Sequence, residues 1–385
     1  MTSLLYIIDI TFFIVMLLSV GYFFIFAFAS LWGSNKKYPV ALKKSRIVVF
    51  IPSYKGDRVI MDSVNSLLDQ DYPDNLFDVV VISDRMEEET NLAISDLPVT
   101  LYEICPENSS KAYALNYAID MLGDGKYNIA VIIDADNVVE TSFLSSINDA
   151  YYSGSEAIQT HRTAKNFDTD IAILDALSEE INNAIFRLGH VNLGLSAALI
   201  GSGMAFEYKW FKENVKKLKT AGEDKELESL LLKQKIFIDY LNNVFVYDEK
   251  TKKADAFSRQ RRRWLASQLG SLKTGLKDLP GALWTMNIDY VDKIIQWMLL
   301  PRVMVLGIIS IATVITTIFS FGLSVKWWLL LIGLSFTFVI AAPDFITHKN
   351  NLKAIRKVPL IFLLMVFNLF RLKGVNKKFI HTNNS

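Results

Sequence analysis

Two aspartates, Asp134 and Asp136, directly follow an apolar run in the segment AVIIDADN at residues 130–137. Carboxylates at this spacing can share one Mg²⁺ or Mn²⁺, which would bridge a diphosphate and neutralise the charge that develops as the diphosphate leaves. The alternative is that Asp136 or Asn137 merely caps a following helix. The pair is therefore a candidate metal site whose chemistry depends on what the fold brings near it.

A second acidic pair, Glu223 and Asp224, precedes the apolar run LESLLL at residues 227–232. An aspartate in such a place can act as a general base that removes a proton from an acceptor hydroxyl group. Thr220 and Glu223 also have the spacing of a helix capping box, so the simple start of a helix is the alternative interpretation.

A third group, Gln260, Arg263 and Trp264, lies in the segment RQRRRW at residues 259–264. Its spacing puts an amide, a guanidinium and an indole on neighbouring positions of one helix face. The planar guanidinium suits a diphosphate, and the indole offers an apolar floor for an acceptor ring. A basic helix resting on anionic lipid would explain only the other arginines of the segment, Arg259, Arg261 and Arg262.

The composition is that of a soluble domain joined to membrane segments. Of the 385 residues, 51% are apolar and 21% are charged, with a mean hydropathy of +0.26. The formal net charge of +1 argues against a nucleic-acid partner, which would need many uncompensated basic side chains. The one cysteine, Cys105, cannot form an internal disulfide and fits a reducing compartment; we expect an inert buried thiol rather than a nucleophile.

Residues 4–32 form an apolar stretch with Asp9 as its one charge, long enough to cross about 30 Å of hydrocarbon. A basic start and a small-residue cleavage site are both absent from it, so we expect a permanent anchor over residues 1–34. Basic residues beside a span mark the cytoplasmic side, and we therefore expect an N-terminus outside the cell. The basic residues in question are Lys36, Lys37, Lys43, Lys44 and Arg46.

Residues 35–280 show short β-branched apolar runs, each followed by a polar turn and a helical stretch. This rhythm predicts an α/β, Rossmann-like domain in the cytoplasm, with helices near 59–69 and 111–121. The runs are apolar at successive positions, as expected of a mostly parallel sheet covered on both faces, at residues 47–51, 79–82 and 130–133. Ligands of such sheets lie beyond the carboxyl ends of the strands, so we expect the chemistry just after each run.

Residues 281–385 are predicted to lie on and in the membrane. Trp284, Tyr290 and Trp297 among polar residues predict an amphipathic interfacial helix, followed by two spans at 298–321 and 327–342. Basic residues at 349–357 would return the chain to the cytoplasm. Residues 358–370 are short for a span, so we expect an interfacial or re-entrant helix there.

Together these segments resemble the family 2 glycosyltransferases with a GT-A fold, specifically the membrane branch that includes cellulose, chitin and hyaluronan synthases and ceramide glucosyltransferase. QRRRW at 260–264 matches the motif Q-x-x-R-W, DAD at 134–136 matches the metal motif, and GED at 222–224 is similar to T-E-D. The opening P-x-Y segment, the lysine-bearing stretch and the small-residue loop of the family resemble IPSYKGD at 51–57, KAYALNYAI at 111–119 and GSGMAF at 201–206.

The resemblance implies an inverting enzyme that uses a nucleotide diphosphate sugar, a UDP-sugar above all, and a divalent cation, Mn²⁺ or Mg²⁺. It implies Asp224 as the base with Glu223 beside it, and Asp136 with Asp134 as the metal site. The donor-binding residues that it implies are Pro52, Tyr54, Asp84, Lys111, Asp134, Gln260 and Arg263. The acceptor-binding residues are Trp264, Gly201, Ser202 and Gly203.

Two positions depart from the family pattern, because Ser83 precedes Asp84 where many relatives have two aspartates, and Gly222 replaces a threonine. We expect a growing polysaccharide as the acceptor, in a bacterial inner membrane, because the tail FRLKGVNKKFIHT resembles the ends of bacterial relatives. A single transfer onto a membrane lipid is the alternative. Three spans are few for a polymer channel, so a homo-oligomer could supply further walls.

Other classes fit the sequence less well. A transporter would need more spans and charges deep within them, and a non-catalytic membrane scaffold would not need these motifs in family order. A dehydrogenase is disfavoured because none of the predicted strands is followed by G-x-G-x-x-G.

Overall fold

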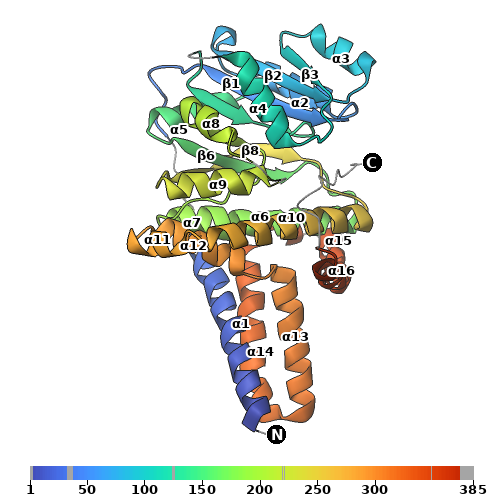
Figure 1. The fold of residues 1–385 in the computed structure, drawn as a ribbon. Helices are drawn as coiled ribbons and strands as arrows, with labels where there is room; N and C mark the ends of the chain where they lie inside the picture. Colours follow the sequence, from blue (N-terminus) through green and yellow to red (C-terminus); the bar gives the residue numbers. More distant parts are fainter. Residues whose placement is uncertain are drawn as a thin grey trace.

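The computed structural model describes residues 3–32, 38–123, 126–218, 220, 222–347 and 349–372. Figure 1 shows an α/β domain, a layer of helices across its base, and a stem of long helices that points away from the sheet. The predicted domain boundary at residue 34, the basic residues Lys36 and Lys37, and most of the tail after residue 372 lie outside the described residues.

The sheet of the α/β domain has eight strands in the order β3-β2-β1-β4-β7-β6-β8-β5. β1 to β4 pair in parallel, whereas β7 runs antiparallel to both β4 and β6. The α/β class is therefore confirmed, but the sheet is mixed and only its first half is purely parallel. The strands are Ile47–Tyr54 (β1), Phe77–Asp84 (β2), Thr100–Ile104 (β3), Ile129–Ile132 (β4), Val138–Val139 (β5), Ala157–Ala164 (β6), Met204–Glu207 (β7) and Ile238–Asp248 (β8).

Helices cover both faces of the parallel half, and this explains its unbroken apolar runs. Val48 and Phe50 of β1 pack toward α4, while Ile47, Val49 and Ile51 belong to the opposite core that includes α2. Successive strand residues point to opposite faces, so every position needs an apolar side chain. The helices of this domain are Ile60–Leu68 (α2), Glu88–Ser95 (α3), Lys111–Leu122 (α4), Phe143–Tyr152 (α5), Tyr208–Val215 (α8) and Glu223–Lys233 (α9).

The layer below the sheet holds α6, α7, α10, α11 and α12, and below it stands the stem of α1, α13 and α14 (Figure 1). The stem helices are each long and apolar enough to cross a membrane. The second predicted span began too early, because α12 ends at Met298 and α13 starts only after Pro301. The helices are Ser3–Ser30 (α1), Asp170–Asn183 (α6), Gly189–Asn192 (α7), Ala254–Gly275 (α10), Leu279–Trp284 (α11), Ile288–Met298 (α12), Arg302–Phe319 (α13), Phe321–Ala341 (α14), Lys349–Leu352 (α15) and Val358–Phe370 (α16).

Buried polar contacts join the stem to the layer above it. Tyr22 of α1 donates a hydrogen bond to Asp292 of α12 at 2.7 Å, and its hydroxyl lies 2.9 Å from Nε2 of His190 in α7. Beside Asp292, Lys293 forms an ion pair with Glu228 of α9 at 3.2 Å, and both side chains are buried. These contacts connect α1 to the helix that begins with Glu223.

Close packing at a glycine completes this junction. A Cβ at Gly189 would lie 2.1 Å from the carbonyl oxygen of Phe26 in α1, so that only glycine allows α7 to approach so closely. The ring of His190 stacks on the ring of Phe26 with centroids 3.6 Å apart. The contact of α1 with the domain therefore depends on the missing side chain.

We predict that Gly189→Ala destabilises the fold by about 1–3 kcal/mol, since the methyl group has to push α7 and α1 apart. The apparent melting temperature of the purified chain in detergent measures this. Gly21→Ala in α1 is the control, because a Cβ there meets nothing within 4 Å, and its melting temperature should not fall. Equal melting temperatures for both variants would contradict the close packing.

Candidate active site

A cavity of about 710 Å³ opens beyond the carboxyl ends of β1, β2 and β4 and continues past α10 to the top of the stem. Most of the site residues predicted from the sequence line it, although they come from segments far apart in the chain. Those in its lining are Pro52, Tyr54, Asp84, Lys111, Asp134, Asp136, Gly201, Glu223, Asp224, Gln260, Arg263 and Trp264.

Lys111 joins three of these segments. It is the first residue of α4, where the side chain of Ser110 caps the helix by accepting a hydrogen bond from a backbone N–H. Its ammonium group lies 2.5 Å from Oδ1 of Asp134, 2.5 Å from the carbonyl oxygen of Gly201 and 3.4 Å from Oε1 of Glu223. Burial alone would lower the pKa of Lys111, but the charges of Asp134 and Glu223 raise it, so the ammonium stays charged.

The aspartates of the DAD segment lie in a turn rather than at a helix start. Asp134 follows β4, the backbone N–H of Asn137 donates to the carbonyl oxygen of Asp134 at 3.0 Å, and β5 comes next. The interpretation of Asp136 or Asn137 as a helix cap is therefore wrong. Both carboxylates are presented at the edge of the sheet, where the cavity opens.

Ser202 and Gly203 lie behind this turn and outside the cavity lining, so the structure does not bring them to an acceptor. Ser202 is fully buried; its hydroxyl accepts a hydrogen bond from the backbone N–H of Asp134 at 2.9 Å and donates one to Asn137 at 2.5 Å. Gly203 has a φ of +65°, and a Cβ there would lie 2.2 Å from Oγ1 of Thr160. Both residues shape the aspartate turn from its inner side.

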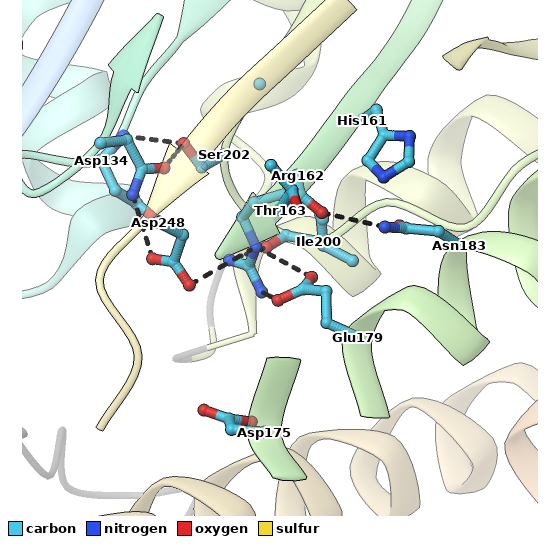
Figure 2. A network of polar contacts seen from close by, with 12 residues as sticks. Asp134, His161, Arg162, Thr163, Asp175, Glu179, Asn183, Ile200, Ser202 and Asp248 are labelled. Carbon is cyan, nitrogen blue, oxygen red and sulfur yellow. Dashed lines mark hydrogen bonds and ion pairs between the residues drawn. The ribbon is translucent and has the colours of Figure 1, made fainter. Parts of the chain in front are cut away.

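A network of buried charges behind the turn is a feature that the sequence reasoning missed. Figure 2 shows Arg162 of β6 between Glu179 of α6 and Asp248 of β8. Nε of Arg162 lies 3.0 Å from Glu179 and 4.0 Å from Asp248, while Lys250 contacts both carboxylates. Burial alone would raise the pKa of Glu179, but Arg162 and Lys250 hold it well below its ordinary value. Arg162, a charged residue within the buried strand β6, is the feature of the sequence that could have indicated this network.

The acidic groups at the turn fit a divalent cation that arrives with a diphosphate. Burial and the charges of Asp248 and Asp134 raise the pKa of Asp136 to about 7, so added positive charge there would be favourable. Among the described residues, three or more metal-binding side chains nowhere converge. One or two carboxylates are enough when phosphate oxygens supply further ligands, and Asp136 with Asp134 meets that need.

The second acidic pair opens α9, and the predicted capping box does not form. Gly222 is the residue before the helix, and the backbone N–H of Thr220 donates to Glu226, not to Glu223, at 2.7 Å. A Cβ at Gly222 would lie 1.9 Å from Oγ of Ser267 in α10, which accounts for a glycine in place of the family's threonine. Burial, with the charge of Asp224, raises the pKa of Glu223 to about 7 although Lys111 acts against it.

The side chains of α10 form the wall of the cavity opposite the sheet. Arg261 pairs with Asp175, and its guanidinium lies over the ring of Trp264 at 4.4 Å from the centroid. The interpretation of Arg261 as a lipid-facing residue is therefore wrong, since it holds the indole in place from inside. Oε1 of Gln260 is buried and has no hydrogen-bond partner within the described part of the chain.

The end of β2 contributes Asp84, which lies beside Tyr54 in the sheet register. Asp84 is buried, and its Oδ1 accepts no hydrogen bond from any described residue. Ser83 occupies the position at which many relatives have another aspartate. Its hydroxyl donates a hydrogen bond to Oδ1 of Asn91 in α3 at 2.7 Å. Cys105 is exposed and does not line the cavity, so the expectation that it is buried is wrong.

The sequence and the fold both resemble known proteins. Residues 45–267 match the family model described as glycosyltransferase like family 2. The mannosyltransferase PcManGT from Pyrobaculum calidifontis, solved with GDP-Man and Mn²⁺, superposes with a TM-score of 0.55 at 16% identity, over 86% of this chain and 96% of that one, and thus shares the fold. TarS 1–349 from S. aureus gives a TM-score of 0.42 at 15% identity, over 86% and 90%. None of the curated proteins matches the sequence.

We predict that Glu179→Gln destabilises the protein by about 3–5 kcal/mol, because it leaves Arg162 and Lys250 buried with too little opposite charge. Thermal unfolding followed by circular dichroism measures the effect. The control is Asp168→Asn, which removes an exposed ion pair with Lys252 and should leave the melting temperature almost unchanged. A similar loss in both variants would show that the buried network adds no special stability.

Proposed function

This chain belongs to glycosyltransferase-like family 2, and from that premise we propose that it transfers a sugar with inversion from a UDP-sugar to an acceptor at the cytoplasmic membrane face. The observation that carries this proposal is the convergence of the three acidic and aromatic groups on one cavity. Asp136, Asp224 and Trp264 all line it, with Lys111 between the first two groups.

Donor binding is assigned to the half of the cavity nearest the sheet. Lys111, Arg263 and Gln260 would contact the diphosphate, and Tyr54 and Asp84 at the ends of β1 and β2 would contact the nucleoside. Two buried acceptor atoms, Oδ1 of Asp84 and Oε1 of Gln260, accept no hydrogen bond from any described residue, although Nε of Arg85 lies 3.9 Å from the first. Both support a polar ligand here, because a buried polar atom is costly until it is hydrogen-bonded. Uracil N–H and ribose hydroxyl groups are donors of the required kind.

A divalent cation held by Asp136 and Asp134 would stabilise the negative charge of the departing diphosphate. Lys111 fixes the orientation of Asp134 and supplies a further positive charge at the same edge. Asp224 is the proposed base: it removes the acceptor hydroxyl proton while the new bond to the anomeric carbon forms and the bond to the diphosphate breaks. One displacement of this kind inverts the configuration. Glu223 holds the ammonium group of Lys111 in place.

The acceptor half of the cavity begins at Trp264 and ends among the stem helices. The apolar side chains of this half favour a lipid-linked acceptor, which is therefore our first candidate. A growing polysaccharide is the second candidate, and it is supported by the resemblance of the C-terminal tail to bacterial relatives. The apolar stem and the basic residues Lys43, Lys44 and Arg46, which follow α1 in the sequence, support an integral membrane protein with its catalytic domain in the cytoplasm and its N-terminus outside.

We predict that Asp224→Asn lowers the transfer rate by about 10²–10⁴-fold, the usual contribution of a general base, while donor affinity stays near that of the natural chain. Release of UDP or GDP from a panel of nucleotide sugars measures transfer, and isothermal titration measures donor binding. Glu226→Gln, in the same helical turn but outside the cavity lining, is the control and should keep full activity. Full activity of Asp224→Asn would remove this residue from the mechanism.

We also predict that chelation of divalent cations stops transfer and that added Mn²⁺ or Mg²⁺ restores it. Asp136→Asn should need a higher Mn²⁺ concentration for half-maximal rate, because one charged oxygen ligand is lost. Titration of Mn²⁺ with UDP present, followed by electron paramagnetic resonance, reports binding independently of activity. Undiminished transfer in excess chelator would contradict the proposed metal site.

A further inference from the structure

The cavity does not end at the acceptor wall but passes into the stem. Part of its lining is apolar and comes from three helices that run toward or beside the proposed membrane region: Leu306 of α13, Phe338 of α14, and Ile361 and Met365 of α16. Figure 1 shows α16 beside the upper end of α13 and below α10. A ligand that filled this cavity would therefore be polar at one end and apolar at the other.

One positive side chain of the cavity lining belongs to a stem helix. Arg302, the first residue of α13, lines the cavity and donates hydrogen bonds from Nη2 to the carbonyl oxygen of Ser178 at 2.7 Å and to its hydroxyl at 3.4 Å. Its Nη1 is buried and has no hydrogen-bond partner, and within the described residues Arg302 forms no ion pair. A buried guanidinium nitrogen without a partner is costly, and an anion that accepts its hydrogen bond would remove this cost.

The surroundings of Arg302 add positive charge and offer it no counter-ion. Arg261 and Arg187 are close enough for their charges to act on it. The acidic partner of Arg261 is Asp175, whereas Arg187 bonds to Asn183 and to a backbone carbonyl and feels the charge of Glu179. Nε of Arg261 is also buried and has no hydrogen-bond partner among the described residues. The N-terminus of the 18-residue helix α13 contributes further partial positive charge at the same place.

From these observations we propose that Arg302 binds the phosphate of a glycolipid acceptor in which that phosphate joins a sugar to a hydrocarbon chain. The sugar would lie on Trp264, with its hydroxyl group near Asp224, and the chain would lie between α13, α14 and α16. The indole of Trp264, the guanidinium of Arg302 and the apolar side chains of the three helices all line this one cavity, so a molecule with a sugar, an anion and a chain matches the chemistry of its lining. The inference rests on the proposed function and names its acceptor class.

The first test compares two synthetic lipids that differ only in the phosphate: dodecyl glucosyl phosphate and dodecyl glucoside. The full chain is held in nanodiscs of phosphatidylcholine, and binding is measured by thermophoresis. We expect the phosphate lipid to bind at least about tenfold more tightly, as is usual for hydrogen bonds to a charged group. Equal affinity for the two lipids would overturn the proposal. Inorganic phosphate that binds as tightly as the phosphate lipid would also overturn it, because the site would then recognise free anion.

The second test replaces the guanidinium. Arg302→Gln should lower affinity for the phosphate lipid about tenfold or more and leave affinity for dodecyl glucoside and for the UDP-sugar unchanged, whereas Arg302→Lys should restore part of the loss. Arg356→Gln, an exposed arginine outside the cavity lining, is the matched control. An unchanged preference for phosphate in Arg302→Gln would overturn the role of Arg302.

The failure of this inference can be told apart from failure of the proposed function. If the natural chain transfers sugar from a UDP-sugar to neutral and phosphate lipids with equal efficiency, the glycosyltransferase assignment stands and the anion site falls. If it neither binds nucleotide sugar nor releases nucleotide with any lipid, the proposed function itself falls. A misfolded Arg302→Gln variant leaves the comparison of the two lipids on the natural chain as the deciding result.

Discussion

The ammonium group of Lys111 is the contact on which the geometry of the site depends. It lies between the carboxylates of Asp134 and Glu223 and also donates to the carbonyl oxygen of Gly201. A shift of this group would leave the buried Glu223 carboxylate or the buried Gly201 carbonyl without it. The end of β4, the start of α9 and the loop before β7 are thereby held around one positive charge. Removing it would leave three carboxylates, including Asp224, to repel each other.

The hydrophobic pattern of the sequence predicted the parallel half of the sheet well. Each strand there is buried on both faces, so its sequence is an unbroken run of apolar residues. β1 and β2 contain the runs predicted at 47–51 and 79–82, and β4 contains all but the last residue of the run predicted at 130–133. The antiparallel insertion of β7 between β4 and β6 could not be predicted, since a four-residue strand is defined by its distant partners more than by its own pattern. The end of α12 at Met298 and the start of α13 at Arg302 could not be predicted from hydropathy either, because apolar residues continue up to Pro301, where the chain breaks between the two helices.

The candidate site could be predicted in outline from motif spacing and family resemblance, as the shared cavity of Asp136, Asp224 and Trp264 indicates. The spacing of motif residues in the sequence does not show in which direction each side chain points in the fold. Ser202 belongs to a motif that resembles an acceptor loop, yet its side chain turns inward to hold Asp134. Arg162 and Lys250 both pair with Glu179, although they lie 17 and 71 positions from it in the sequence. Only the folded structure shows that these three charged groups are in contact.

The junction at Gly189, Tyr22 and Asp292 has a consequence for substrate choice. Contacts there continue through Lys293 and Glu228 into α9, so the stem and the helix whose first turn holds Asp224 are joined by buried groups with little room to shift. If the stem lies in a bilayer as proposed, the carboxylate of Asp224, the proposed base, would lie at a set height above the lipid surface. An acceptor whose hydroxyl group lies at a different distance from the bilayer surface would then not be glycosylated, even if its chemistry were suitable. The distance between hydroxyl group and membrane would therefore select substrates in addition to their chemical identity.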